Sequence, residues 1–310
     1  MADRNLAPAT SLGGALAALA LGALGALGAL ALSAQAYAGP QPQAGAQAPA
    51  SGGSSPADAR CLAGDTPRSG QPGKDVMWIP TPEPLVERML RLAEVGPTDT
   101  VYDLGSGDGR IVIAAAKLGA RAVGVEYNPK LVALSRCLIA AAGLANRAHI
   151  VQGDLFHTRF ASASVVTLFL LPQLDVRLRP ELLALKPGTR IVSHAYLMGA
   201  WQPDRRIITP DGMAYLWIVP AHVDGHWTFR RAHGRDRFDV TLIQAYQDLL
   251  GTEGANNGAL ENVRLRGAQL AFDFQDGSGV VHLTGHVGGA QIDAKVTRDG
   301  HTSAYVGTRS

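Results

Sequence analysis

The stretch TDTVYDLGSGDGRIVIAAAKLGARAVGVE, residues 98–126, decides the fold of this chain. A β-branched run at residues 100–102 leads into the glycine-rich segment 103–109 and then into an alanine-rich apolar stretch typical of a helix. A second strand-like run, residues 122–125, ends at Glu126. The pattern predicts a strand, a glycine turn, a helix and a strand. The glycines allow a sharp turn and a close approach to a ligand, which the first N–H groups of the helix would face.

The acidic residues around this turn indicate the kind of ligand. Glu126 lies about 20 residues beyond the turn, where nucleoside-binding units of this type hold ribose hydroxyls. The glycine spacing is G-x-G-x-G, not the G-x-G-x-x-G of dinucleotide sites, and the carboxylates of Asp103 and Asp108 would repel a pyrophosphate. They suit a ligand that carries an amino group and a sulfonium. An ordinary βαβ turn without a ligand is the alternative.

This stretch resembles the first motif of class I S-adenosylmethionine-dependent methyltransferases. The resemblance implies that the glycines pass close to the cofactor, that Asp103 and Asp108 lie near its amino-acid end, and that Glu126 binds the ribose. Asp154, directly after the third expected strand, would contact the adenine amino group; a turn-forming Gly-Asp pair is the alternative. The implied S-adenosylmethionine-binding residues are Asp103, Gly105, Ser106, Gly107, Asp108, Gly109, Glu126 and Asp154.

The flanking pattern predicts an α/β fold with a doubly wound, Rossmann-like sheet. Helical stretches alternate with apolar runs, and ASVVTLFLL at residues 163–171 is typical of a central parallel strand. Ligands of such sheets bind at the carboxyl ends of the strands. We expect strands at residues 100–102, 122–125, 149–152, 163–171, 190–196 and 215–219, and helices at residues 83–95, 129–142 and 173–185.

The pattern changes at about residue 215, after which short alternating runs are separated by turn signals such as Asp276-Gly277. This predicts a small antiparallel all-β domain, a sandwich or a barrel. It could bind a substrate protein, dimerise, cover the active site or simply stabilise the chain.

The N-terminal region has two different compositions. Residues 12–34 carry no charge and are about as long as a membrane-spanning helix, which predicts an N-terminal apolar helix. Small-x-small sites at residues 34–38 fit a cleaved signal peptide equally well, and the two interpretations stay open. Residues 39–75 are rich in Pro, Gln, Ala, Gly and Ser and predict a disordered linker. The expected division is therefore 1–38 signal or anchor, 39–75 linker, 76–220 catalytic domain and 221–310 β-domain.

Composition bounds the partners. The chain has 310 residues, 46% of them hydrophobic, and a net charge of +2, with no long basic run, so nucleic acid is not an expected partner. The two cysteines, Cys61 and Cys137, are expected to stay unpaired because Cys137 falls in a helical pattern that places it in the core. No metal site is expected.

Other segments narrow the resemblance. Trp78-Ile79-Pro80-Thr81-Pro82 approximates a Val-x-Pro-Thr-Pro motif; VVTLFLLP spans residues 165–172 and LKPGTRIVSHAYLMGAW spans residues 185–201. Together they look like the family of mitochondrial ATP synthase c-subunit and adenine nucleotide translocase lysine methyltransferases and its bacterial relatives. The resemblance covers about residues 76–205. It implies protein-lysine N-methylation, with a membrane-associated protein as substrate and a membrane attachment through residues 12–34.

The segment after the fourth expected strand bears on the acceptor. Leu170-Leu171-Pro172 stands where nucleic-acid amino methyltransferases carry Asn/Asp-Pro-Pro-Tyr, which indicates a narrow apolar channel for a lysine side chain instead. Candidate catalytic residues of this channel are Phe169, Pro172 and His194, with Trp201 beside them; core packing is the alternative for each.

Three rival functions stay open. The cofactor site would serve a small-molecule or lipid methyltransferase equally well. The chain could also be a nucleoside-binding envelope protein without catalysis, or an envelope protein that binds through its β-domain. The expected location is a membrane anchor or the cell envelope, although S-adenosylmethionine is made in the cytosol.

Overall fold

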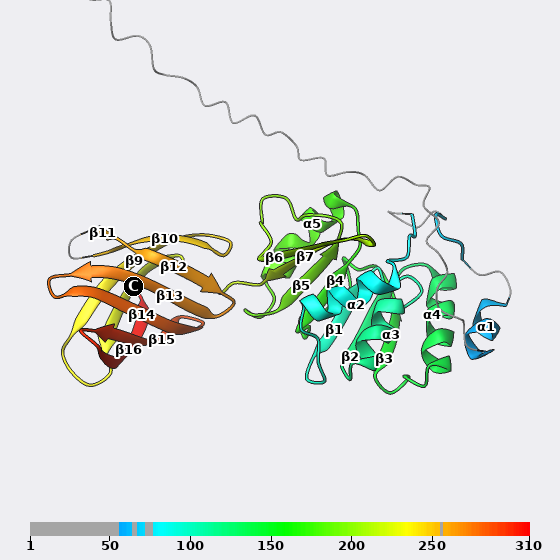
Figure 1. The fold of residues 1–310 in the computed structure, drawn as a ribbon, viewed down its shortest axis with the longest axis horizontal. Helices are drawn as coiled ribbons and strands as arrows, with labels where there is room; N and C mark the ends of the chain where they lie inside the picture. The colour runs from blue at the N-terminus through cyan, green and yellow to red at the C-terminus, as the bar shows by residue number, and fades with distance from the viewer. Residues whose placement is uncertain (1–55, 64–66, 72–76, 255–256) are drawn as a thin grey trace, which may run out of the picture. The chain divides into compact units, whose positions relative to one another are not determined.

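The fold is described from a computed structural model, which describes residues 56–63, 67–71, 77–254 and 257–310. The described chain contains a seven-stranded sheet and a nine-stranded sheet, labelled by element in Figure 1. The expected signal or anchor at residues 1–38 lies outside the described residues. No helix in the described ranges is long and apolar enough to cross a membrane.

The first sheet has the strand order β3-β2-β1-β4-β5-β7-β6. Strands β1 to β5 are parallel, and β7 runs antiparallel to both of its neighbours. The carboxyl ends of the five parallel strands therefore lie along one edge, as a doubly wound sheet requires. The bounds are β1 Thr100–Leu104, β2 Arg121–Glu126, β3 Ala148–Gln152, β4 Val165–Leu168, β5 Arg190–His194, β6 Arg205–Thr209 and β7 Gly212–Ile218.

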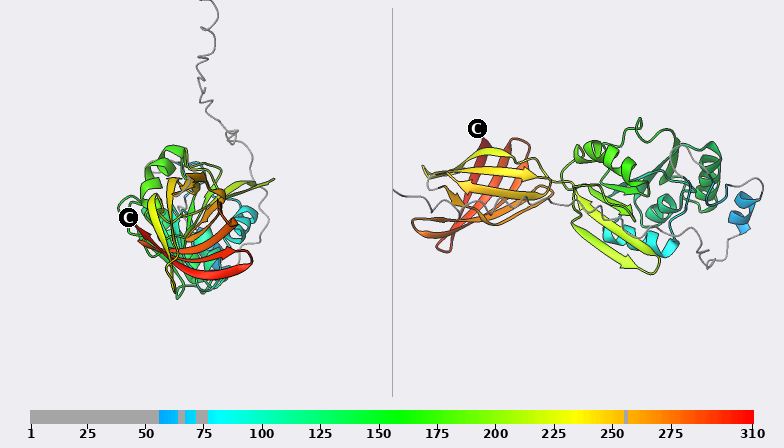
Figure 2. Two further views of the ribbon diagram at one scale, coloured as in Figure 1. Left: turned by 90° about the vertical axis from the view of Figure 1, so that its left-hand side faces the viewer. Right: turned by 90° about the horizontal axis from the view of Figure 1, so that it is seen from above.

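Helices cover both faces of this sheet (Figures 1 and 2). Helices α2 (Glu83–Leu92), α3 (Arg110–Lys117) and α4 (Pro129–Ala141) pack on one face, and α5 (Pro172–Leu183) packs on the other. A proline stands in the first turn of α2, α4 and α5, where its missing N–H costs no helical hydrogen bond. The parallel strands are thus buried on both sides, which confirms the Rossmann-like fold.

The second sheet is antiparallel and has the order β11-β10-β9-β8-β16-β15-β14-β13-β12. Burial alternates along its strands, so one face forms an apolar interior and the other faces solvent. The strands curl around that interior as a near-barrel (Figures 1 and 2). The bounds are β8 Gly225–Arg231, β9 Arg237–Ala245, β10 Asp248–Glu253, β11 Gly258–Ala259, β12 Glu261–Arg266, β13 Gln269–Asp276, β14 Gly279–Gly288, β15 Gln291–Arg298 and β16 His301–Arg309.

The expectation for the cysteines is wrong. Cys137 lies on the exposed side of α4, and it forms a disulfide with Cys61, which lies 76 residues earlier. Cys61 belongs to a short helix, α1 (Pro56–Leu62), inside the stretch expected to be a disordered linker. The buried face of α4 includes Leu131 and Leu134 but not Cys137. The apolar residues of the sequence therefore wrongly indicated that Cys137 shares this face.

Several strand expectations also change. The fourth strand ends at Leu168, so Phe169 lies beyond it, in the loop before α5. Strand β6 was not expected, because its sequence, RRIIT, does not alternate apolar with polar residues. The short alternating runs expected after residue 215 form the strands β8 to β16, and a turn around Gly267 separates β12 from β13.

Candidate active site

The glycine loop joins β1 to α3 at the carboxyl edge of the sheet. Gly107 and Gly109 have φ values of +54° and +80°, a region that side chains rarely adopt. A Cβ on Gly107 would lie 2.4 Å from the Trp78 Nε1, and one on Gly109 would lie 2.9 Å from the Ser135 Cβ. These positions therefore need glycine both for backbone conformation and for space.

Glu126, at the end of β2, is tied to this loop. Its carboxylate accepts hydrogen bonds from the Gly107 N–H at 2.8 Å and the Asn128 N–H at 2.7 Å. Burial raises the pKa of Glu126, and these backbone N–H groups oppose that rise. The acid thus lies beside the glycine turn, where a ribose diol bound at the turn would meet it.

Asp103, at the base of the loop, is buried. The Thr167 hydroxyl on β4 donates a 2.7 Å hydrogen bond to its carboxylate. Burial raises the pKa of Asp103 to about 7, and the nearby charges of Asp108 and Glu126 add to the rise. Three carboxyl groups therefore concentrate negative potential at one place, which favours a cationic ligand.

Asp108 connects the loop to the segment before α2. It forms an ion pair with Arg110, 2.6 Å between Oδ2 and Nη2, and Arg110 Nη1 donates to the Thr81 carbonyl at 2.9 Å. Thr81 and Trp78 thus fix the Pro-Thr-Pro segment beside the glycine loop. The motif at residues 78–82 is part of the site.

Asp154 follows β3, and its side chain is used locally. It accepts a hydrogen bond from the Phe156 N–H at 2.9 Å and lies 3.2 Å from His157 Nδ1. These contacts are those of a turn-forming aspartate. The adenine contact expected for Asp154 stays a prediction.

A hydroxyl in the glycine loop supports a fit to S-adenosylmethionine. The Ser106 Oγ is buried in the loop and has no hydrogen-bond partner within the described chain. A buried hydroxyl in that state is expected to be satisfied by a bound group. With the carboxyl groups of Asp103, Asp108 and Glu126 around it, the loop can take an ammonium, a sulfonium and a ribose diol.

A second group lies at the ends of β4 and β5. His194 Nδ1 lies 3.1 Å from the Thr81 Oγ1, and its ring lies 3.9 Å from the ring of Phe169, centroid to centroid. Burial lowers the pKa of His194 to about 4, so the imidazole is neutral at neutral pH. Ala195, which follows it, has φ +68°, and the Tyr196 N–H donates to the His194 carbonyl. A non-glycine residue with the positive φ of Ala195 is strained and is held in place by its surroundings. The next residue, Tyr196, has its ring 6.3 Å from the ring of Phe169, centroid to centroid.

The other two expected channel residues lie elsewhere in the packing. Pro172 is exposed and begins α5. Trp201 is fully buried, donates to the Gln247 side chain at 2.9 Å and stacks near Tyr246. The core alternative therefore holds for Trp201.

Sequence reasoning missed three residues of the region. Thr167 is hidden inside an apolar run, although a lone polar residue there could have been singled out. Tyr196 falls at the end of an expected strand, where nothing in the pattern sets it apart. Asp175, in the first turn of α5, is fully buried, and neither of its carboxylate oxygens accepts a hydrogen bond within the described chain. Burial raises the pKa of Asp175 to about 8, and the nearby Ser193 hydroxyl opposes part of that rise.

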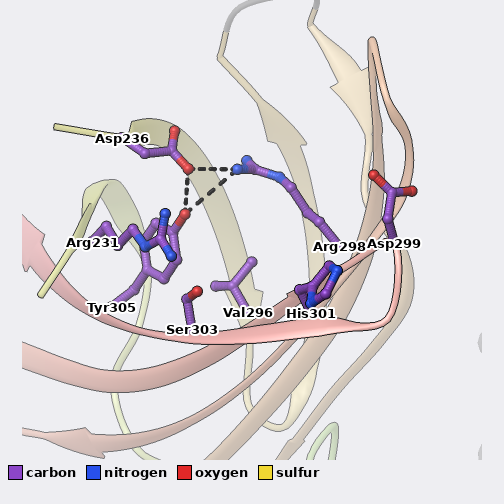
Figure 3. Close-up of a pocket in the computed structure, with 8 residues that line it drawn as sticks. All are labelled: Arg231, Asp236, Val296, Arg298, Asp299, His301, Ser303 and Tyr305. Atoms are coloured by element: carbon purple, nitrogen blue, oxygen red, sulfur yellow. Dashed lines mark hydrogen bonds and ion pairs between the residues drawn. The ribbon is translucent and has the colours of Figure 1, made fainter. Parts of the chain in front are cut away.

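The nine-stranded sheet has a hollow of its own, of about 240 Å³ (Figure 3). Arg298 reaches across it to Asp236, 2.6 Å between Nη1 and Oδ2, and the Tyr305 hydroxyl donates to the same carboxylate. A second acid, Asp276, also pairs with Arg298. The positive charge of Arg298 is thus paired with two carboxylates. Among the described residues, no cluster of three or more His, Cys, Asp or Glu could hold a metal ion.

The sheet order, the glycine loop after β1 and the acid that closes β2 define an S-adenosylmethionine-dependent methyltransferase. The profile of the ANTKMT methyltransferase domain matches residues 103–205. A protein-lysine N-methyltransferase from Saccharolobus islandicus is 44% identical over 47% of this chain and 96% of its own length. The chain therefore belongs to the family of protein-lysine N-methyltransferases that carries this domain.

Two further similar proteins have names that differ from that of the Saccharolobus enzyme. The mouse lysine N-methyltransferase of the ATP synthase c-subunit is 38% identical over 45% of this chain, which spans 56% of the mouse enzyme. A solved structure of an RNA methyltransferase from Salinibacter ruber, in complex with S-adenosyl-L-homocysteine, is 50% identical over 47% of this chain and 96% of its own, with a TM-score of 0.46.

Proposed function

We propose that this enzyme methylates the ε-amine of a lysine in a membrane-associated protein. The observation that carries the proposal is the 44% identity to a protein-lysine N-methyltransferase along nearly its whole length. The names of two mouse relatives, for the ATP synthase c-subunit and for adenine nucleotide translocase, support a protein acceptor. The uncharged segment 12–34 supports a membrane location for enzyme and substrate.

The aromatic group at the ends of β4 and β5 suits this acceptor. Bound S-adenosylmethionine supplies an electrophilic methyl group on a sulfonium. Phe169 and Tyr196 offer ring faces to a lysine side chain, and desolvation there lowers the pKa of its amine, which favours the neutral nucleophile. Asp103 and Glu126 would hold S-adenosylmethionine, whose sulfonium methyl group would be the group transferred to the amine, and the amine would give up its proton to solvent. Neutral His194, held by Thr81, aligns the amine without adding a repelling charge.

A transfer assay tests the acceptor class. The full chain is incubated with S-[methyl-³H]adenosylmethionine and, separately, with the membrane proteins, lipids and RNA of the same cells. Label should enter protein and appear as methyl-lysine after acid hydrolysis. Glu126→Ala should abolish the transfer, and Glu181→Ala, a change of an exposed acid on α5, should not. Label confined to RNA or to lipid would refute the lysine acceptor.

We also propose that residues 12–34 hold the enzyme at a membrane. Two observations favour opposite sides of the membrane for the catalytic domain. The Cys61–Cys137 disulfide supports an oxidising compartment, whereas the cofactor is made in the cytosol. Labelling intact cells with a membrane-impermeant amine reagent decides the matter: labelling before lysis supports the oxidising side, and labelling only after lysis supports a cytosolic catalytic domain.

A further inference from the structure

We propose that the groove between α2 and β6 binds an extended acidic segment of the substrate protein as an added strand. The inference rests on the proposed function and names the docking segment that the substrate would need. It starts from β6, the last strand in the order of the seven-stranded sheet. Within the described chain β6 pairs only with β7, so one edge of its backbone is open. Open edges accept extended peptides by main-chain hydrogen bonding.

The groove beside this edge has an apolar floor. Its volume is about 550 Å³. Leu92 on α2 is buried at its base, Ile207 on β6 is half-buried, and Ile208 is 69% exposed. An extended chain laid along β6 would bury apolar surface here, which favours binding.

The rim of the groove is basic. It carries three arginines, Arg88, Arg91 and Arg205; the acid Glu87 lies among them, and Glu94 lies 3.8 Å from Arg205 in a second exposed pair. Arg91 lies 4.0 Å from Glu87, and both side chains are more than two-thirds exposed. Arg88 forms no ion pair with any residue of the described ranges. Exposed pairs contribute little, so these arginines can turn to a ligand's carboxylates at small cost. The charge of the groove therefore selects an acidic segment.

The groove leads toward the active site. Strand β6 runs parallel to β5, and its last residue, Thr209, lies at the edge of the sheet where β5 ends. The next strand begins at Gly212, where a Cβ would lie 3.0 Å from the His194 Nε2. A peptide added to the open edge of β6 lies three strand spacings, about 14 Å, from β5, which about four extended residues can cross. A segment bound on β6 would thus place a lysine a few residues away at the channel.

Synthetic peptides test the groove. Three peptides of 14 residues share a backbone of alternating Thr and Val and one acceptor lysine. A few residues from that lysine, three positions carry Glu in the first peptide, Gln in the second and Lys in the third. We expect the Glu peptide to bind the full chain at least tenfold tighter than the Gln peptide, measured by fluorescence anisotropy, and its KM for methylation to be lower by the same factor. Arg88→Glu and Arg205→Glu should each raise that KM with little change in kcat. They should leave the KM of the Gln peptide unchanged.

Arg121→Glu is the matched control, because it makes the same charge change at an exposed arginine at the start of β2. Equal binding of the three peptides, or an equal loss in the Arg121 variant, would overturn the inference. So would a concentration-dependent dimer that the groove variants abolish, since a second copy of the chain would then occupy the edge. Anisotropy needs no turnover, and calorimetry with S-adenosylmethionine checks the cofactor site. Acidic-peptide binding without methylation would therefore count against the proposed function and not against the groove.

Discussion

At the scale of single residues, Asp103 has the most demanding environment of the cofactor loop. Burial and two neighbouring acids raise its pKa to about 7, yet a carboxylate must be charged to hold a ligand's ammonium group. Near and below neutral pH, the binding of such a ligand must therefore displace a proton. The loop couples cofactor affinity to pH.

Calorimetry of S-adenosylmethionine binding at pH 6 and pH 8 checks this coupling. We expect tighter binding at pH 8 and, at pH 6, a proton released to the buffer, seen as an enthalpy that depends on the buffer used. Asp103→Asn should bind weakly and lose the proton release. A wild-type affinity that is the same at both pH values would contradict the role of Asp103.

Asp175 gives a prediction about stability. Because its folded pKa, about 8, lies above the ordinary value of 3.8, the folded protein binds this proton more tightly than the unfolded chain. The contribution of Asp175 to the free energy of unfolding is therefore largest below about pH 4. It decreases as the pH rises from about 4 to about 8 and does not change further above about pH 8. Asp175→Asn should stabilise the protein at pH 9 relative to the wild type, by on the order of a few kcal/mol, and much less at pH 4. Denaturant unfolding at the two pH values measures the difference, and Asp293→Asn, the same change at an exposed site, is the matched control.

At the scale of the elements, the glycine turn and the segment before α2 act together. Gly107→Ala would place a methyl group against Trp78 in addition to straining the backbone. We expect cofactor affinity to fall by at least about tenfold. Gly143→Ala is the matched control, since Gly143 has φ +70° but no atom within 4 Å of the new methyl group. Both variants carry about 1–2 kcal/mol of backbone strain, so a wild-type affinity in the first would show that Trp78 moves freely.

The disulfide joins α1 to α4 and closes a loop of chain that contains the glycine turn. Chain entropy predicts that a link across 76 residues stabilises the fold by about 4 kcal/mol. Cys61→Ser with Cys137→Ser should therefore lower Tm by on the order of 10 °C. The reductant dithiothreitol should lower the Tm of the wild type by a similar amount and leave that of the double variant unchanged. A reductant effect on the double variant would assign the change to something other than this bond.

At the scale of the whole molecule, the features that could be predicted from the sequence are those that depend on residues close together in the chain. The glycine turn, Glu126 and the alternation of strands and helices are encoded in contiguous residues, and the class of enzyme followed from them. The pairing of Cys61 with Cys137 was mispredicted because it depends on which side of α4 faces outward. Strand β6 was missed because its sequence, RRIIT, does not alternate apolar with polar residues. The contact between Thr81 and His194 is tertiary and joins residues 113 positions apart.

The order of the second sheet carries one more consequence. Strand β16, the last of its strands along the chain, lies in the middle, with four strands on either side. A premature stop codon before His301 would therefore not trim a margin of the β-domain. It would divide the hydrogen-bonded order of the sheet into two halves of four strands and uncover the apolar interior that includes Phe229 and Ile292. This domain thus cannot finish folding until residues 301–309 have left the ribosome, however early its first hairpins form.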